Sequence, residues 1–355
     1  MRIDFLINSL KGGGTEKVCV SIANKLVEEG WKVNLHILDD SGSYYDVKDG
    51  VILNYLGKTN TLQSPLKIVK LLKDKKIKKI LIFNHELALV AYLVKKITFN
   101  DTKLITRLNN TLSIAIKSKK KSYQIVITTM MKLFYRHLDF YIFQSTGIKE
   151  DTIKNYNVSR DYKIINNPIG TVLSVKEKSQ SKTKELLYIG RLVPQKNVID
   201  ILKAIKLLIR NDIKVHLSIV GDGIDSYKLN QYCENEKIEN HVTFHGYQKR
   251  TSSFYSQADL TILSSINEGF PNVLLESLSH LTPVVSYDTP SGPKEIIQKG
   301  VNGFLVPYMD YHELANFIEL ALNHEWSTQK ISKSIAKYNI SHIVNEYKDV
   351  FKKFD

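Results

Sequence analysis

The residues best suited to chemistry in this sequence are two glutamates with seven residues between them. Both lie in the segment Asn267-Glu268-Gly269-Phe270-Pro271-Asn272-Val273-Leu274-Leu275-Glu276. A carboxylate accepts hydrogen bonds, so carboxylates at these two positions could bind the vicinal hydroxyls of a sugar or a ribose. The alternative, from local structure alone, is that Glu268 is an exposed turn residue and Glu276 an exposed helix residue.

The residues between the glutamates predict a turn that leads directly into a helix. Gly269 permits a tight turn, and Pro271 suits the first helical position because the N–H that proline lacks would be unpaired there. The free N–H groups and the partial positive charge of a helix N-terminus favour an anion such as a diphosphate. We therefore expect an anionic group to bind beside the two glutamates.

Strand and helix patterns alternate in both halves of the chain. The first half begins with a strand at 3–8, the glycine loop 11–14, a helix over 15–29 with Thr15 as its N-cap, and a strand at 33–38, and further strands are expected at 79–83, 103–106 and 140–144. In the second half we expect strands at 186–189, 215–220, 242–245, 260–263, 283–286 and 304–306, and helices at 198–211, 226–237, 271–280, 293–298 and 311–323. This order predicts an α/β protein with two Rossmann-like, doubly wound domains.

Length and turn composition place the domain boundary near the middle of the chain. A chain of 355 residues exceeds the roughly 250–300 residues at which a single core stops growing. Turn residues at 166–170 and a polar stretch at 175–185 favour a linker there. We predict an N-terminal domain at 1–170, a C-terminal domain at 171–326, and a helical tail at 327–355 that packs back on the first domain.

The cysteines and the apolar runs indicate a cytoplasmic protein. Cys19 and Cys233 are far apart and lack metal-ligand spacing, so no disulfide framework or zinc site is expected. The longest apolar run, Leu87–Val94, is too short to span a bilayer. A soluble or peripheral protein is therefore predicted.

Positive charge is concentrated in the first half. Residues 1–170 hold 28 Lys and Arg against 15 Asp and Glu, a net charge of +13 out of +14 for the chain. Much of it lies in two runs, Lys73–Lys79 and Lys117–Lys121. Such runs suggest a polyanionic partner, and the alternative is a solvated lysine-rich face.

Several motifs in order along the chain resemble glycosyltransferase family 4, retaining enzymes of the two-domain architecture called GT-B. The paired glutamates and the residues after them, through Phe304-Leu305-Val306, match its donor-site signature. Tyr188-Ile189-Gly190-Arg191-Leu192-Val193-Pro194-Gln195-Lys196-Asn197, Val220-Gly221-Asp222-Gly223 and the opening glycines match as well. Together they cover nearly the whole second half and the start of the chain. The resemblance implies two Rossmann-like domains that face each other across a cleft.

The resemblance assigns roles to these residues. It implies that Glu268 lies against the donor sugar as the catalytic residue and that Glu276 binds ribose hydroxyls. Arg191 and Lys196 would neutralise the diphosphate. The rest of the donor site would be backbone groups, from Gly269, Phe270, Pro271, Asn272 and Val273 and, across the cleft, from Gly12, Gly13 and Gly14.

No metal or other cofactor is expected, because the nucleotide sugar is a co-substrate and no Asp-x-Asp occurs in the sequence. Leaving-group charge would then be stabilised by Arg191, Lys196 and helix N-terminal amides. The resemblance implies same-face attack, in which the departing phosphate takes the acceptor proton, without a covalent nucleophile.

The acceptor side departs from the family pattern. Members often carry a histidine or Ser-Glu-Arg-Asn-Asn at a sheet edge, and this chain has Thr106-Arg107-Leu108-Asn109-Asn110 there. Asn109 and Asn110 match, whereas Leu108 replaces the expected Arg or His. His85, which follows a predicted strand, is a second acceptor-side candidate. The alternative interpretation is that His85 is a loop histidine with a local hydrogen bond.

The leading hypothesis is transfer of a hexose or N-acetylhexosamine from a UDP-sugar to a lipid-linked saccharide, in O-antigen, lipopolysaccharide or capsule biosynthesis. The basic half would dock on the anionic inner face of the plasma membrane. A nucleotide-sugar epimerase of GT-B fold is the alternative. Nucleic-acid binding is disfavoured, because the sequence has no recognisable reader module and no aromatic-basic interleaving.

Overall fold

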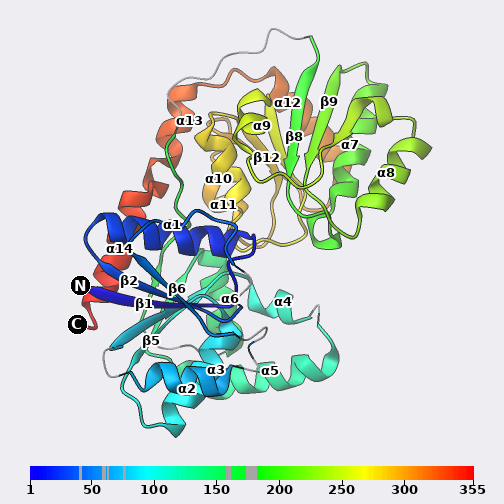
Figure 1. The fold of residues 1–355 in the computed structure, drawn as a ribbon. Coiled ribbons are helices and arrows are strands. Elements are labelled where there is room, and N and C mark those ends of the chain that lie inside the picture. The colour runs from blue at the N-terminus through cyan, green and yellow to red at the C-terminus, as the bar shows by residue number, and fades with distance from the viewer. Residues whose placement is uncertain are drawn as a thin grey trace. The chain divides into compact units, whose positions relative to one another are not determined.

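The computed structural model describes residues 1–39, 42–57, 61, 64–74, 77–117, 119–156, 158, 161–172 and 182–355. The chain divides into two compact units (Figure 1). Unit 1 contains Met1–Pro168 and Tyr338–Asp355, and unit 2 contains Ile169–Lys337. Residues 175–181 of the predicted linker lie outside the described residues.

Unit 1 is built on a seven-stranded parallel sheet with the strand order β3-β2-β1-β4-β5-β6-β7. The order reverses between β1 and β4, and in open α/β sheets ligands bind outside the carboxyl ends of strands at such a switch point. The strands are β1 (Arg2–Ile7), β2 (Lys32–Ile37), β3 (Val51–Tyr55), β4 (Lys79–Ile82), β5 (Lys103–Leu108), β6 (Phe140–Phe143) and β7 (Tyr162–Ile164).

Helices cover both faces of this sheet, because strand residues point alternately to the two sides. One face packs against α1 and α14, which lie side by side, and the other against α2 to α6 (Figure 1). The helices are α1 (Gly14–Glu28), α2 (Pro65–Leu72), α3 (His85–Ile97), α4 (Leu112–Lys117), α5 (Lys121–Phe134), α6 (Thr146–Tyr156) and α14 (Ile340–Lys352).

Unit 2 repeats this plan with a six-stranded parallel sheet in the order β10-β9-β8-β11-β12-β13, which reverses between β8 and β11. Its strands are β8 (Lys184–Ile189), β9 (Val215–Val220), β10 (Val242–Phe244), β11 (Leu260–Leu263), β12 (Val284–Tyr287) and β13 (Gly303–Val306). Its helices are α7 (Val198–Arg210), α8 (Ser226–Asn235), α9 (Ser252–Gln257), α10 (Asn272–Ser279), α11 (Pro293–Ile296), α12 (Tyr311–Asn323) and α13 (Thr328–Ile335).

Two parallel-sheet α/β units confirm the predicted fold class, and every predicted strand is present. The sequence analysis missed β3 and β7, which are short, partly exposed strands at the two edges of the unit 1 sheet. The predicted N-cap of α1, Thr15, was wrong. The helix begins at Gly14, and Gly13 takes the cap position without a side-chain hydrogen bond.

The predicted C-terminal tail is divided between the two units. α13 belongs to unit 2, where it contacts α10, whereas α14 belongs to unit 1, where it contacts α1. The buried face of α14 includes Tyr347, Val350 and Phe351. The ring of Phe351 lies 6.3 Å from that of Phe5 and 5.9 Å from that of Trp31. Hydrophobic burial therefore attaches the last helix to the first strand's core.

One lysine of the first basic run is part of this core. Lys79 is buried, its ammonium donates a hydrogen bond of 2.8 Å to the carbonyl of Phe351, and it forms an ion pair with Asp355. Lys75 and Lys76 of the same run lie outside the described residues. Among the described residues, no helix is long and apolar enough to cross a membrane.

Replacing Phe351 with alanine should destabilise unit 1 through loss of packing around α14. Removing a buried phenylalanine side chain costs about 3–5 kcal/mol, so we expect a clearly lower urea midpoint for Phe351→Ala. Lys352→Ala removes a neighbouring exposed side chain and should leave the midpoint unchanged. Equal midpoints for the two variants would show that α14 does not stabilise the unit.

Candidate functional site

The two predicted glutamates lie on the loop and helix that follow β11, next to the switch point of the unit 2 sheet. Glu268 precedes α10, and Glu276 lies within it. Gly190 and Arg191 follow β8, the neighbouring strand. Because parallel strands end at the same edge of the sheet, residues separated by about 75 positions in sequence meet there.

Lys196 and Glu268 form an ion pair at this edge, with 2.5 Å between Nζ and Oε1. Glu268 is only 9% exposed, and the Lys196 side chain is also largely covered. An ammonium has three donors, so Lys196 can bind Glu268 and still donate to a ligand oxygen. The structure therefore has an ammonium–carboxylate ion pair at the position where the sequence predicts a sugar-phosphate site.

Two backbone segments position this pair. Ile266 N–H donates to the carbonyl of Gln195 at 2.8 Å, and the Gln195 amide donates to the carbonyl of Asn267 at 2.9 Å. The Ser264 hydroxyl lies within 3.1 Å of the carbonyls of Lys196 and Asn197. These contacts hold the loop after β8 against the loop after β11, so the Lys196–Glu268 pair depends on the fold around it.

A buried tyrosine lies under the same loop. The Tyr188 hydroxyl donates to the carbonyl of Arg191 at 3.1 Å. Burial raises the pKa of Tyr188 and the charge of Glu268 raises it further, while Arg191 opposes both effects. The phenol therefore stays neutral and acts as a hydrogen-bond donor, while the Arg191 side chain is exposed to solvent.

Close backbone contacts at this edge require glycine. A Cβ on Gly223 would lie 2.2 Å from the carbonyl oxygen of Leu192, and one on Gly221 would lie 1.9 Å from that of Gly190. Distances this short are repulsive, so any side chain there would push the β8 loop away. The Val220–Gly223 motif thus supports the loop that carries Arg191 and Lys196.

Glu276 is half-buried on α10 and is oriented by Tyr255. The Tyr255 hydroxyl donates to Glu276 Oε2 at 3.2 Å, and burial followed by the Glu276 charge raises the pKa of Tyr255. The His280 ring stacks on Tyr255 with 5.3 Å between ring centroids. The neutral Tyr255 hydroxyl thereby orients the carboxylate on the helix.

The N-terminus of α10 differs in one detail from the prediction. Pro271 is the N-cap with extended backbone, and the helix begins at Asn272. Proline has no side-chain acceptor to cap the helix, and a hydrogen bond of 3.1 Å runs from the Ser291 hydroxyl to the carbonyl of Gly269. Gly269, Phe270 and Pro271 are buried, whereas Asn272 and Val273 are partly exposed. The partial positive charge at the N-terminus of α10 favours an anion there.

In unit 1 the predicted glycines follow β1 at the carboxyl edge of the sheet. Gly12 N–H donates to the carbonyl of Leu10 at 3.2 Å, and Gly13 N–H donates to the Tyr45 hydroxyl at 2.7 Å. The backbone donors of Gly12 and Gly13, which the resemblance assigned to phosphates, are therefore paired within unit 1. Gly12 has φ +59°, which suits glycine.

The acceptor-side candidate His85 is the first residue of α3, which is capped by Asn84. Burial lowers the pKa of His85, the charge of Glu86 opposes this, and Lys119 adds to the lowering. The imidazole is therefore neutral at neutral pH and can accept a proton or a hydrogen bond. The Tyr123 hydroxyl on α5 donates to the Glu86 carboxylate.

The second candidate, Asn109, belongs to a hydrogen-bonded group that the sequence analysis did not identify. The buried guanidinium of Arg107 donates to the side-chain oxygens of Asn109 and Asn167. Gln144 donates to Asn109 Oδ1 at 2.7 Å. The sequence predicts only a turn at Asn166-Asn167-Pro168. The signal that could have identified the group is that Asn109, Gln144 and Asn167 each come after one of three neighbouring strands.

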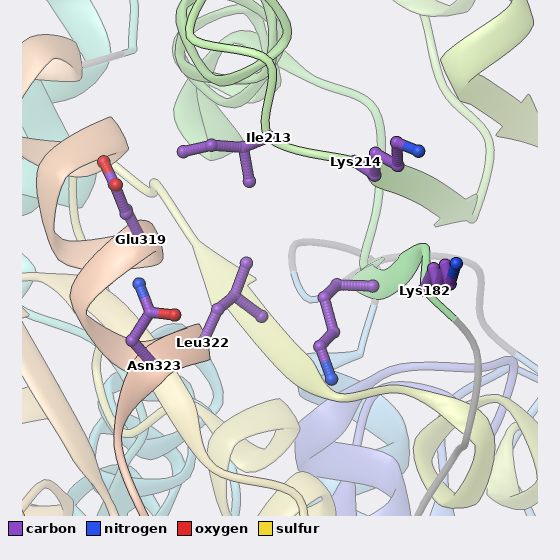
Figure 2. Close-up of a pocket in the computed structure, with 7 residues that line it drawn as sticks. Lys182, Ile213, Lys214, Glu319, Leu322 and Asn323 are labelled. Carbon is purple, nitrogen blue, oxygen red and sulfur yellow. The ribbon is translucent and has the colours of Figure 1, made fainter.

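A pocket of about 170 Å³ opens elsewhere on unit 2, at the amino-terminal edge of its sheet (Figure 2). None of the predicted site residues lines it, and Figure 2 shows Lys182 and Lys214 apart from Glu319 and Asn323. Its lining consists of Lys182, Lys184, Ile213, Lys214, Glu319, Leu322 and Asn323. Among the described residues, no group of three His, Cys, Asp or Glu is arranged to hold a metal ion.

Two family models together match almost the whole chain. Residues 12–172 match the model described as Glycosyltransferase Family 4, and residues 172–340 match Glycosyl transferases group 1. A Haemophilus influenzae protein named as an uncharacterized glycosyltransferase is 23% identical over 98% of both chains.

A second relative is named for its substrate. The Campylobacter jejuni GalNAc-alpha-(1->4)-GalNAc-alpha-(1->3)-diNAcBac-PP-undecaprenol alpha-1,4-N-acetyl-D-galactosaminyltransferase is 26% identical over 98% of this chain and 97% of its own. Among solved structures, Anabaena Alr3699/HepE in complex with UDP aligns with a TM-score of 0.78 at 18% identity, over 99% of this chain and 100% of that one.

Proposed function

The chain belongs to glycosyltransferase family 4, and from that premise we propose that it transfers a hexose or N-acetylhexosamine from a UDP-sugar to a lipid-linked saccharide. The observation that carries the proposal is the Lys196–Glu268 pair beside the N-terminus of α10, with Glu276 further along the same helix. This arrangement offers a cation and backbone donors for a diphosphate and carboxylates for hydroxyls.

In the proposed donor complex, Glu276 accepts hydrogen bonds from the ribose hydroxyls. The diphosphate binds at the N-terminus of α10 and is neutralised by Arg191 and Lys196. Glu268 accepts a hydrogen bond from the sugar, and its ion pair with Lys196 holds the carboxylate in place. The choice of uracil as the base is supported by the UDP bound to a protein of the same fold.

We propose a retaining reaction on one face of the sugar. A hydroxyl oxygen of the acceptor forms a bond to the anomeric carbon as the bond from that carbon to the β-phosphate oxygen breaks. The acceptor proton passes to the departing phosphate oxygen. Arg191, Lys196 and the α10 amides stabilise the charge that develops there, so the reaction needs no metal. We assign Glu268 no role as a nucleophile, because same-face attack forms no covalent intermediate with the enzyme.

Incubating the protein with UDP-, GDP- and dTDP-sugars and a lipid-linked saccharide tests this proposal. We expect one UDP-sugar to be consumed only when the acceptor is present, at the same rate in Mg²⁺ and in EDTA, with the anomeric configuration retained by NMR. Loss of transfer in EDTA would overturn metal independence. Conversion of UDP-GlcNAc to an epimer without acceptor would instead favour the epimerase alternative.

Replacing Glu276 should weaken donor binding. Removing a carboxylate that accepts hydrogen bonds from ribose costs about 1.5–3 kcal/mol, which is roughly a 10- to 100-fold rise in the Kd for UDP. We expect this rise for Glu276→Ala in calorimetric titration with UDP. Glu234→Ala removes an exposed carboxylate from α8 in the same unit and should leave the Kd unchanged. Equal affinities would refute the ribose assignment.

We propose that unit 1 binds the acceptor and docks on the inner face of the plasma membrane through α5. The exposed side of this helix carries Ile125, Val126 and Leu133, which are 61%, 59% and 51% exposed. Exposed lysines and an arginine flank these apolar side chains, at Lys117, Lys119, Lys120, Lys121, Lys132 and Arg136. Apolar side chains among cations on one exposed helix face suit an anionic lipid surface.

The lipid acceptor of the Campylobacter relative is consistent with a substrate held at a membrane. A cytoplasmic protein that docks reversibly could take a soluble nucleotide sugar and a lipid-linked saccharide at the same time. We therefore place this enzyme in surface polysaccharide assembly, in O-antigen, lipopolysaccharide or capsule biosynthesis.

Neutralising the cations before α5 should release the protein from anionic vesicles. Each lysine near such a surface contributes about 1 kcal/mol, so changing Lys117, Lys119, Lys120 and Lys121 to Gln should reduce partitioning by about 100-fold or more. Flotation with phosphatidylglycerol-containing liposomes measures this. A control with the same net charge changes Lys228, Lys237, Lys299 and Lys330, exposed lysines of unit 2, and should float like the unmodified protein. Equal flotation of both variants would refute docking through α5.

A further inference from the structure

Four side chains at the carboxyl edge of the unit 1 sheet form a closed ring of hydrogen bonds, which we call the Arg107 ring. Arg107 donates to Asn109 Oδ1 and to Asn167 Oδ1. Asn167 Nδ2 donates to Gln144 Oε1 at 3.3 Å, and Gln144 Nε2 donates to Asn109 Oδ1 at 2.7 Å. Arg107 lies on β5, Asn109 and Gln144 directly follow β5 and β6, and Asn167 lies in the loop after β7.

The ring permits only one orientation of each carboxamide. A guanidinium has donors and no acceptor, so both groups that face Arg107 must present oxygen. Asn109 Oδ1 accepts two hydrogen bonds, and a rotated amide would direct its own N–H groups at two donors. The orientation of Asn109 is therefore determined by Arg107 and Gln144 together.

This orientation leaves a donor at the edge of the sheet. Asn109 Nδ2 donates one hydrogen to the carbonyl of Phe83 at 2.8 Å, and its second hydrogen has no role in the ring. Asn109 is half-buried, and His85 lies two residues after Phe83. A ligand at this edge would therefore meet a fixed N–H donor, which suits a hydroxyl or other oxygen acceptor.

Arg107 holds its charge with neutral partners. Its side chain is 0% exposed, its Nε donates to the Tyr347 hydroxyl at 2.7 Å, and its guanidinium lies 5.6 Å from the centre of the Phe83 ring. Within the described part of the chain, no carboxylate forms an ion pair with it. A hydrogen bond from a cation is stronger than one between neutral groups, and it polarises the amide that accepts it. The Asn109 N–H is thereby a stronger donor.

We propose that Arg107 is a positioning residue that acts through Asn109, whose free N–H binds an oxygen of the lipid-linked acceptor saccharide. The inference rests on the proposed function, because it concerns how that acceptor is bound. Arg107 itself is too deeply buried to touch a substrate. Its role is to determine the direction and the strength of the Asn109 donor.

Steady-state kinetics with the full chain, a UDP-sugar and the lipid-linked saccharide test the proposal. Arg107→Met should raise the KM for the acceptor about tenfold, the effect of one lost charge-assisted hydrogen bond, with the KM for the donor within twofold of the unmodified enzyme. Asn109→Ala should show the same change. Because Arg107 acts through Asn109, the double variant should be no worse than Asn109→Ala alone.

Two further variants keep the test decisive if Arg107→Met does not fold. Gln144→Met breaks the ring at another bond and should show the same rise in acceptor KM. Tyr347→Phe removes the Nε partner on α14 but leaves the ring closed, so it should lower the melting temperature without changing either KM.

The outcomes separate the two levels of the hypothesis. No transfer by the unmodified enzyme would refute the proposed function. Transfer by the unmodified enzyme, with an unchanged acceptor KM in the ring variants, would refute the positioning role. Fully additive effects of Arg107→Met and Asn109→Ala would also refute it, since the two residues would then act independently.

Discussion

The common direction of the strands is the constraint on which both candidate sites depend. In a parallel sheet all carboxyl ends meet at one edge, and the connections that follow them are neighbours in space. In unit 2 this brings Lys196 to Glu268, and in unit 1 it brings Asn109, Gln144 and Asn167 together. Functional side chains then need no local sequence proximity, because the topology supplies their contacts.

Buried charge is stabilised in different ways at the carboxyl edges of the two sheets. Lys196 is paired with a carboxylate, so the pair is neutral overall and its members are held by the Ser264 and Gln195 contacts. Arg107 is surrounded by neutral oxygens and an aromatic face, and no carboxylate of the described residues forms an ion pair with it. Desolvating a cation in this way is costly unless each donor has a partner, which explains why three separate side chains converge on it.

The sequence was sufficient to predict the fold, and it located the loops and the helix that carry the candidate donor-site residues. Strand and helix periodicity predicted both sheets, and the spacing of Glu268 and Glu276 identified the loop and helix after β11. It could not predict that Lys196 would pair with Glu268, because periodicity locates both at the same edge without indicating which side chains touch. For the same reason, the sequence could not predict that Tyr255 would donate a hydrogen bond to Glu276.

The hydrogen-bonded residues of unit 1 could not be predicted from the sequence for a different reason. An arginine inside a β-strand has no periodic signal of its own, and Arg107 is satisfied by groups up to 240 residues away in sequence, including Tyr347 on the last helix. Its environment exists only after α14 has packed on the sheet. The predicted tail at 327–355 was expected to pack back on the first domain, but nothing in the sequence indicated that Tyr347 of α14 would contact Arg107 on β5.

The two basic runs can be interpreted only when the burial of their lysine side chains is known. The run at 73–79 includes Lys79, whose ammonium is used inside the protein, so it is not a uniform solvated patch. The run at 117–121 leads into α5, where exposed apolar side chains accompany the cations. A face that served only solubility would have no use for three exposed Ile, Val and Leu side chains, whereas a face that meets lipid headgroups uses both kinds of contact. The distribution of side chains on α5, rather than the net charge of the half, is therefore the stronger argument for a membrane partner.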